Sequence, residues 1–267
     1  MFGPVTTPAN PQRVVALGWS DAEAALALGV QPVAVSDWMG FGGTGVGPWA
    51  ADLFTTPPTI LGTLELSYEQ ISSLEPDLIL NTRSDNSAQK HDELSKIAPT
   101  VSAPPGVVAY GTTWQQQMEM VSAALGKPDE GAKLIAEVDK AFADAAAANP
   151  EFAGKTVVVG AYFGDRYGAY VRGDSRVDFT ESLGFVNTPE IQAQAGESFS
   201  IELAREQIEQ LSADLTVIFP IGGDATALHQ DPVLNQIPSA LAGHMLIMED
   251  ATLIEAFSSG SRAPRRV

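Results

Sequence analysis

The stretch EQISSLEPDL, residues 69–78, returns as EQIEQLSADL at residues 206–215. The two copies share Glu, Gln, Ile, Leu, Asp and Leu at the same positions, without a gap. In each copy the apolar residues fit one face of a short helix, and an Asp and an apolar run follow, which predicts a helix leading into a buried strand. One such unit in each half of the chain predicts two lobes of like topology, with a ligand cleft between them.

The apolar runs around the two copies predict that both lobes are α/β. Residues 13–17 and 32–35 are strand-like and enclose a helical stretch, 20–28, whose first residue, Ser20, suits an N-cap. A strand, a helix and a strand at this spacing form a βαβ unit, which predicts a parallel central sheet and a Rossmann-like lobe. Further strands are expected at 77–80, 100–101, 156–160, 215–219 and 245–248, and further helices at 94–97, 113–125, 178–183 and 232–237.

One long helix is predicted between the lobes. From residue 129 to residue 149 the apolar residues keep helical spacing, and Asn149-Pro150 ends the pattern. A helix of about 20 residues is about 30 Å long, enough to cross a small domain. We therefore expect an N-terminal lobe at 1–126, a linking helix at 127–150 and a C-terminal lobe at 151–267.

The composition narrows the class of protein. The chain has 33 acidic and 15 basic residues, a formal net charge of -18, which disfavours nucleic-acid binding because a binding face must neutralise phosphates. It has no cysteine, which excludes thiol catalysis and Cys-ligated metal sites and favours an exported protein. No stretch approaches the roughly 20 apolar residues of a membrane span. Residues 1–8 lack the features of a signal peptide, so we expect a cytosolic protein or a mature, trimmed form.

A glycine-rich segment, MGFGGTGVGPWAA at 39–51, raises the alternative of an α/β enzyme that binds nucleotides. Its spacing fits neither G-x-G-x-x-G nor a P-loop, and Pro48 is expected to prevent an immediate helix. A hydrolase would need a G-x-S-x-G elbow, which the sequence lacks. We expect a loop here and no enzymatic activity.

The whole pattern resembles the periplasmic binding proteins of ABC importers for ferric siderophores, haem and cobalamin. The most specific stretch is YEQISSLEPDLI at 68–79, and LSKIAPTV at 94–101 and LGK at 125–127 are also typical of that family. The resemblance implies a monomeric, extracytoplasmic protein, periplasmic or lipid-anchored at the cell surface. Such a protein captures its ligand in the cleft without a resident cofactor and delivers it to a transmembrane permease.

The resemblance also assigns the repeated glutamates. In that family one Glu on each lobe engages arginines of the permease, and Glu69 and Glu206 match those positions. An acidic residue in the first turn of a helix also complements the helix dipole, so both explanations can hold. Members usually end with a further helix after a segment like 256–260, whereas here a short basic tail, 261–267, follows.

Ligand contacts in the N-terminal lobe are expected beyond the carboxyl ends of its parallel strands. This rule selects Trp19 after the first strand, Trp38 after the second and Arg83 after the strand of the first repeat copy. Trp49, within the glycine-rich segment, is a further candidate, whereas Trp114 is expected in the core.

In the C-terminal lobe the candidates crowd into one segment, YFGDRYGAYVRGDSR at 162–176. Arginine stacks on flat rings and pairs with carboxylates, and tyrosine gives a flat face and a hydroxyl, which suits a bulky anionic chelate or haem propionates. The alternative is a surface hairpin with local pairs between Asp165 and Arg166 and between Asp174 and Arg176. The candidate ligand contacts are Tyr162, Arg166, Tyr167, Tyr170, Arg172 and Arg176.

Three cargoes or functions are therefore weighed. A ferric siderophore is preferred, haem is the near alternative, and an α/β enzyme is the third. The three histidines, at 91, 229 and 244, lie far apart in sequence, so we expect no His metal site, although a tyrosine could still coordinate iron.

Overall fold

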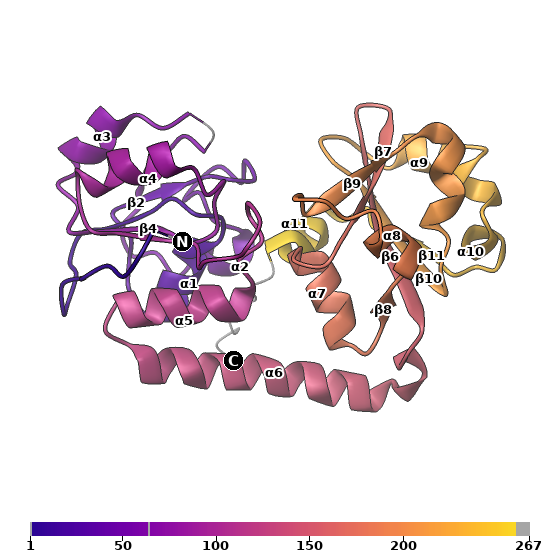
Figure 1. Cartoon of the computed structure of the whole chain (residues 1–267), viewed down its shortest axis with the longest axis horizontal. Helices are drawn as coiled ribbons and strands as arrows, with labels where there is room; N and C mark the ends of the chain where they lie inside the picture. The colour runs from indigo at the N-terminus through magenta and orange to yellow at the C-terminus, as the bar shows by residue number, and fades with distance from the viewer. Residues whose placement is uncertain (1, 64, 260–267) are drawn as a thin grey trace. The chain divides into compact units, whose positions relative to one another are not determined.

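The computed structural model describes residues 2–63 and 65–259, and it divides the chain into two compact lobes (Figure 1). The division falls between Glu137 and Val138, inside the long helix α6 (Pro128–Ala148). The predicted linking helix is thus confirmed in place and length. Leu134 and Ile135 of α6 pack on the N-terminal lobe, and Phe142 meets Phe179 of the C-terminal lobe. Within the described residues, no helix is both long and apolar enough to cross a membrane.

The N-terminal lobe contains a five-stranded parallel sheet, as predicted, in the order β3-β2-β1-β4-β5. The central strand β1 pairs with β2 on one side and β4 on the other, which is the expected βαβ arrangement. The edge strand β3 was not predicted, because it directly follows Pro57-Pro58 and contains only two apolar residues in a row, Ile60 and Leu61. The strands are β1 (Val14–Ala16), β2 (Ala34–Ser36), β3 (Thr59–Leu61), β4 (Leu78–Asn81) and β5 (Thr100–Ser102).

Helices cover both faces of this sheet, as Figure 1 shows. Apolar residues of α1 (Asp21–Ala27) and α5 (Trp114–Ala124) pack on one face with Val14, Leu78 and Leu80. Those of α3 (Tyr68–Ser73) and α4 (Ala88–Ser95) pack on the other with Val15 and Ile79. Alternate residues of each strand therefore feed two separate cores, which explains the continuous apolar runs of the sequence.

Three local predictions in this lobe are corrected. Ser20 precedes α1 with a positive φ of 63°, rather than the extended backbone typical of an N-cap, and makes no side-chain cap hydrogen bond. Pro48 does not prevent a helix but begins the short α2 (Pro48–Ala51), at the first position, where no N–H is needed. The helix expected at 94–97 is α4, which begins at Ala88 because the Ser87 hydroxyl accepts from the Lys90 N–H.

The C-terminal lobe contains a mixed sheet in the order β11-β10-β6-β7-β9, with β8 also paired to β6. Strands β11, β10, β6 and β8 are mutually parallel, whereas β7 runs antiparallel to β6 and β9. The hairpin arises at Gly164 and Asp165, both with positive φ, the conformation that a two-residue hairpin turn requires. The strands are β6 (Thr156–Phe163), β7 (Arg166–Tyr170), β8 (Val186–Asn187), β9 (Ser200–Leu203), β10 (Leu215–Pro220) and β11 (Met245–Ile247).

Short helices complete the C-terminal lobe. The helix expected at 178–183 is α7, which starts earlier because Asp174 caps it, and the helix expected at 232–237 is reduced to a 3₁₀ turn, η3. The segment 256–259 lies in α11, whose Ile254 and Phe257 pack into the core, and the basic tail lies outside the described residues. These elements are η1 (Pro150–Phe152), α7 (Ser175–Ser182), α8 (Pro189–Gln192), η2 (Arg205–Leu211), α9 (Thr226–Gln230), η3 (Leu234–Gln236), α10 (Pro238–Leu241) and α11 (Ala251–Ser259).

The aspartate shared by the two repeat copies does the same work in each lobe. Asp77 accepts hydrogen bonds from the N–H groups of Gln12, at 2.7 Å, and Arg13, at 2.9 Å, just before β1. Asp214 accepts from the N–H of Thr156, at 2.8 Å, at the start of β6. Each aspartate thus ties the end of its helix–strand unit to the first strand of the lobe, which explains why the residue recurs.

Candidate ligand-binding site

The strand-end rule brings three aromatic side chains together in the N-terminal lobe. Trp19 follows β1, Trp38 follows β2 and Tyr110 follows β5. The Trp19 ring stacks on Trp38 with centroids 5.0 Å apart and on Tyr110 with centroids 4.1 Å apart. Phe41 continues the group, since its ring meets Trp38 and Trp49 edge-on with centroids 5.9 and 5.8 Å apart. We call these five residues the aromatic cluster; each is half-buried.

Arg83 braces this cluster through hydrogen bonds to its backbone. It is 2% exposed, and its Nε donates to the carbonyl oxygen of Tyr110 at 2.9 Å. Its own carbonyl accepts from the Trp19 N–H at 2.9 Å, and the Tyr110 N–H donates to Ser84 at 2.7 Å. Backbone and side-chain hydrogen bonds of Arg83 and its neighbour Ser84 therefore join the loops after β1, β4 and β5 and hold the backbone that carries the rings.

Asp21 fixes the backbone beneath Trp19. Its buried carboxylate accepts from the Thr82 N–H at 2.9 Å, from the Thr82 hydroxyl and from Gln117 Nε2 at 2.6 Å. Gln117 Nε2 also donates to the Trp19 carbonyl oxygen at 2.7 Å. Burial raises the pKa of Asp21, and the hydrogen bonds oppose that rise. Gly18 is required here, because an added Cβ would lie 2.3 Å from an Asp21 oxygen.

The sequence analysis missed Tyr110 and Phe41; the strand-end rule could have found Phe41, which lies five positions beyond the last residue of β2, but not Tyr110. Tyr110 lies eight positions beyond the last residue of β5, in an irregular segment, and its φ is positive at 60°. Phe41 was hidden among the glycines of 39–47. Its place is set by Asp37, whose carboxylate accepts from the N–H groups of Phe41, at 2.7 Å, and Gly42, at 2.8 Å.

The crowded segment of the C-terminal lobe does not form one cluster. Tyr162 and Tyr167 lie on one face of the hairpin, with ring centroids 5.1 Å apart, and Tyr170 lies on the other. Three positions separate Tyr167 from Tyr170, and side chains alternate along a strand, so the two must point to opposite faces. The Tyr162 hydroxyl donates to Asp165 at 2.8 Å, so the expected pair between Asp165 and Arg166 is not formed.

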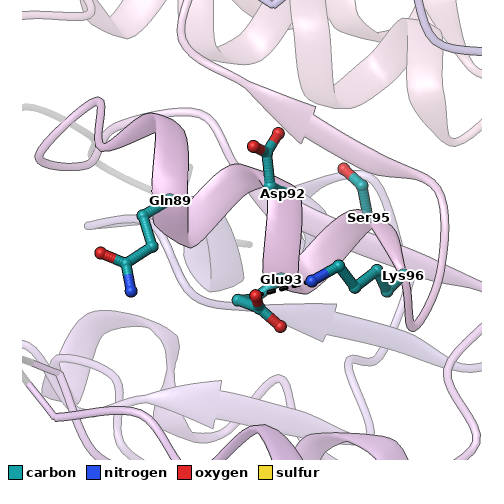
Figure 2. Close-up of a pocket in the computed structure, with 5 residues that line it drawn as sticks. All are labelled: Gln89, Asp92, Glu93, Ser95 and Lys96. Carbon is teal, nitrogen blue, oxygen red and sulfur yellow. Dashed lines mark hydrogen bonds and ion pairs between the residues drawn. The ribbon is translucent and has the colours of Figure 1, made fainter.

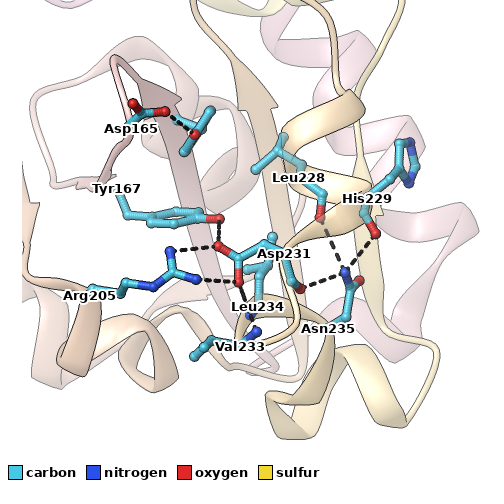
Figure 3. A network of polar contacts seen from close by, with 10 residues as sticks. Asp165, Tyr167, Arg205, Leu228, His229, Asp231, Val233, Leu234 and Asn235 are labelled. Atoms are coloured by element: carbon cyan, nitrogen blue, oxygen red, sulfur yellow. Dashed lines mark hydrogen bonds and ion pairs between the residues drawn. The ribbon is translucent and has the colours of Figure 1, made fainter.

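Tyr167 belongs to a polar network that sequence reasoning did not anticipate (Figure 3). Its buried hydroxyl donates to Asp231 Oδ2 at 2.8 Å, and the Arg205 guanidinium reaches both Asp231 oxygens at 2.9 and 3.1 Å. Asp231 also accepts from the N–H groups of Val233 and Leu234. Burial opposes the charge of Asp231, but these bonds outweigh it and lower the pKa of that carboxyl. Burial and the bond to Asp231 raise the pKa of Tyr167.

Tyr170 and Arg176 lie in the core of the lobe. The Arg176 guanidinium is 3.8 Å above the Tyr170 ring, and its Nε donates to Asp174 at 2.8 Å. A further nitrogen donates to the Ser258 hydroxyl of α11 at 3.0 Å. The expected pair of Asp174 and Arg176 therefore exists, but it is buried. These contacts account for both residues as core residues, and we do not include them among the proposed ligand contacts.

Arg166 and Arg172 are the exposed cations of the segment. Arg166 pairs with Glu202 of β9 at 3.1 Å, and Arg172 pairs with Glu181 of α7 at 2.8 Å. The Arg166 pair is exposed on both sides and is therefore weak, whereas Arg172 holds both oxygens of the partly buried Glu181. A ligand carboxylate or hydroxamate would therefore compete for Arg166 more readily than for Arg172.

The two repeated glutamates have equivalent surroundings. Glu69 lies in the first turn of α3 and Glu206 in the first turn of η2, and both side chains are exposed. Neither carboxylate forms an ion pair within residues 2–63 and 65–259. Each lobe thus offers one exposed carboxylate at the start of its repeat helix.

A shallow hollow also lies along α4, lined by Gln89, Asp92, Glu93, Ser95 and Lys96 (Figure 2). Its cation, Lys96, is already paired with Glu93 at 2.6 Å, and no aromatic side chain lines it. Such a surface does not suit a flat or bulky anionic ligand. In the described part of the chain, no group of three or more His, Asp or Glu side chains is placed to hold a metal ion.

The sequence profile of the periplasmic binding protein family matches residues 14–251, a span that includes both lobes and α6. The chain belongs to this family of binding proteins. The "Probable siderophore-binding lipoprotein YfiY" of Bacillus subtilis (strain 168) is 31% identical over 236 residues, which cover 81% of this chain. The match covers 66% of that relative, so the chain spans slightly less than two thirds of its length.

Solved structures of other periplasmic binding proteins have the same fold. A periplasmic solute binding protein from Mycobacterium smegmatis str. MC2 155 superposes with a TM-score of 0.82 at 30% identity, covering 98% of this chain and 91% of that one. PiaA of Streptococcus pneumoniae TIGR4 in complex with ferrichrome gives a TM-score of 0.81 at 26% identity, covering 96% and 89%. These likenesses extend over both lobes.

Proposed function

We propose that this periplasmic binding protein captures a ferric siderophore and delivers it to the permease of an ABC importer. The aromatic cluster at the strand ends of the N-terminal lobe carries the proposal. Flat, half-buried rings held by a rigid brace present apolar area and π faces at low entropic cost, which suits a bulky ferric chelate. In the C-terminal lobe the exposed guanidinium groups of Arg166 and Arg172 are each candidate partners for the anionic oxygens of a chelate. PiaA, which was solved with ferrichrome, and YfiY support the same class of cargo.

The test is a titration of tryptophan emission with ferrichrome, ferrioxamine B and haemin. We expect at least one ferric siderophore to quench the emission with a micromolar or lower Kd. Trp38→Ala should raise that Kd about fivefold, because a lost ring stack is worth about 1 kcal/mol. Trp114→Phe is the matched control, since Trp114 begins α5 outside the aromatic cluster. Binding of haemin with a shifted Soret band, without binding of either siderophore, would make haem the cargo.

Docking to the permease is proposed for Glu69 and Glu206. One exposed carboxylate on each lobe could pair with one basic residue on each half of a two-fold permease. Glu69→Ala combined with Glu206→Ala should leave the Kd for the siderophore unchanged and abolish uptake into cells. Unchanged uptake would mean that the two carboxylates only stabilise the starts of their helices and do not dock to the permease. This function places the protein outside the cytoplasm, in a periplasm or lipid-anchored at the cell surface.

A further inference from the structure

Basic side chains are scarce in the lobe that carries the aromatic cluster. Residues 1–126 include twelve acidic residues but only four basic ones. The basic residues are Arg13, Arg83, Lys90 and Lys96. A strongly anionic cargo seated on this cluster would need a positive partner from among these four side chains, so the place of each one bears on the charge of the cargo.

The two arginines are committed to the fold. Arg83 is 2% exposed, and its Nε donates to the Tyr110 carbonyl oxygen, so its guanidinium offers almost no surface to a ligand. Arg13 directly precedes β1, and its Nε donates to the Leu74 carbonyl oxygen at 2.9 Å. It therefore lies at the amino ends of the parallel strands, whereas the aromatic cluster lies beyond their carboxyl ends.

The two lysines are already neutralised by acidic neighbours. Lys90 pairs with Asp85 at 2.7 Å, and Lys96 pairs with Glu93 at 2.6 Å. Within residues 2–63 and 65–126, every basic side chain is thus buried, paired with a carboxylate or placed at the opposite ends of the strands.

Negative charge, by contrast, lies directly beside the rings. Asp37 precedes Trp38, and its carboxylate accepts from the Phe41 N–H at 2.7 Å. The faces of aromatic rings are themselves electronegative, so they attract cations and repel anions. The cluster therefore favours a cargo that is neutral or positive.

The C-terminal lobe gives the same result by itself. Its exposed arginines at the hairpin and on the adjoining loops each pair with a carboxylate: Arg166 with Glu202, Arg172 with Glu181 and Arg205 with Asp231 (Figure 3). Asp165, at the hairpin turn, forms no ion pair in the described part of the chain, so it adds one uncompensated negative charge. The segment at 162–176 therefore lacks the surplus of positive charge that its composition suggested.

We propose that the cargo carries no net negative charge and is a neutral or singly positive ferric tris-hydroxamate, rather than a tris-catecholate, a citrate complex or haem. Each hydroxamate brings a single negative charge to Fe³⁺, so the complete complex is neutral, and its oxygens still accept hydrogen bonds from a guanidinium. Catecholates and citrate leave the complex anionic, and haem carries propionates. The inference rests on the proposed function and narrows its cargo.

The test keeps one chelate and changes only its charge. Ferrioxamine B has an ammonium group outside its iron-binding core; acetylation removes that charge, and succinylation replaces it with a carboxylate. The Kd of each form is measured by quenching of tryptophan emission at low salt. We expect the succinylated form to bind about tenfold more weakly than the acetylated form, and ferrioxamine B to bind at least as tightly as the acetylated form. In 0.5 M salt the differences should shrink, because salt screens exposed charges.

A pair of variants locates the effect. Glu202→Gln leaves Arg166 without its partner, so it should lower the Kd of the succinylated form about threefold and leave that of the acetylated form unchanged. Glu137→Gln is the matched control, because it releases Lys133 from an exposed pair on α6 by the same change, and neither Kd should move.

Two results would overturn the inference while the proposed function stands. One is equal or tighter binding of the succinylated form at low salt in the wild type. The other is binding of a ferric tris-catecholate or of ferric citrate without binding of ferrichrome or ferrioxamine B. Failure of all these ferric chelates to bind would instead contradict the proposed function itself.

Discussion

In the N-terminal lobe only uncharged donors bond to the buried carboxyl of Asp21, and Glu23 Oε1 has no hydrogen-bond partner among the described residues, whereas in the C-terminal lobe arginines pair with Asp174 and Asp231. Burial raises the pKa of the first two, while hydrogen bonds lower the pKa of Asp231. Two α/β lobes that share a helix–strand repeat thus contain buried acids in two kinds of surroundings. The difference shows that the repeated unit does not fix the electrostatics of the lobe, so the two lobes should respond to pH in opposite directions.

The largest effect is expected from removing Asp231, the buried acid that pairs with Arg205. Asp231→Ala removes the partner of the buried Tyr167 hydroxyl, of Arg205 and of two backbone N–H groups. We expect a loss of about 3–4 kcal/mol in the free energy of unfolding of this lobe, because buried polar groups are left without partners. Urea unfolding measures it, with Asp144→Ala as control, since Asp144 forms only an exposed pair on α6. A loss below about 1 kcal/mol would show that the network adds little.

The opposite behaviour is expected in the N-terminal lobe as pH rises. The folded pKa of Glu23, about 7, exceeds the ordinary value of 4.5, so its contribution is complete below about pH 4.5 and is lost as pH rises to 7. The expected loss is about 3 kcal/mol over that window. Hydrogen exchange of this lobe at pH 5 and pH 8 measures it, and Glu23→Gln should remove that part.

The contribution of Asp231 to stability depends on pH in the opposite sense. Its folded pKa is lowered, so its contribution holds above its ordinary pKa and is lost only when pH falls through the lowered value. Between pH 5 and pH 8 the C-terminal lobe should therefore keep its stability. Equal changes in both lobes over this range would contradict the comparison.

A smaller effect separates the two repeat copies. In the first, the Ser67 hydroxyl accepts from the Gln70 N–H at 3.2 Å and an α-helix follows, whereas the second begins at Ala204 without a side-chain cap and forms a 3₁₀ helix. Ser67→Ala should cost about 1 kcal/mol, because a cap is lost, and Ala204→Ser should gain about half of that. Thermal unfolding of the two variants checks both signs. An increase in stability for Ser67→Ala would exclude a capping contribution.

The sequence predicted the elements that are long and regular, namely α5, α6 and the buried strands β1, β4, β6 and β10. It failed where a few residues decide the structure. The hairpin of β6 and β7, which the sequence offered only as an alternative for residues 162–176, depends on the two-residue turn at Gly164 and Asp165, and β9 contributes too few buried residues to stand out. The second copy forms a 3₁₀ helix where the first forms an α-helix, a difference that the shared residues of the repeat do not reveal.

The site was predictable in part for similar reasons. Trp19 and Trp38 follow buried strands directly, so the strand-end rule places them together, as the structure does. Tyr110 follows its strand at a distance that no rule specifies. Tyr170 and Arg176 counted as ligand contacts because composition marks a cluster without saying which side chains face the core. The burial of Glu23 could not be predicted from the sequence, since it depends on how α1 packs against a later loop of the chain.

The four tryptophans all lie in the N-terminal lobe and therefore act as a built-in spectroscopic probe of that lobe. Absorption at the long-wavelength edge of the near-ultraviolet spectrum is due to the indole rings and therefore to that lobe alone. The C-terminal lobe absorbs through its tyrosines and phenylalanines. Two indoles whose rings stack 5.0 Å apart, at Trp19 and Trp38, should also couple their transitions. Their exciton signal in near-ultraviolet circular dichroism would record the spacing of the two rings directly, without a label and without a second lobe to confuse it.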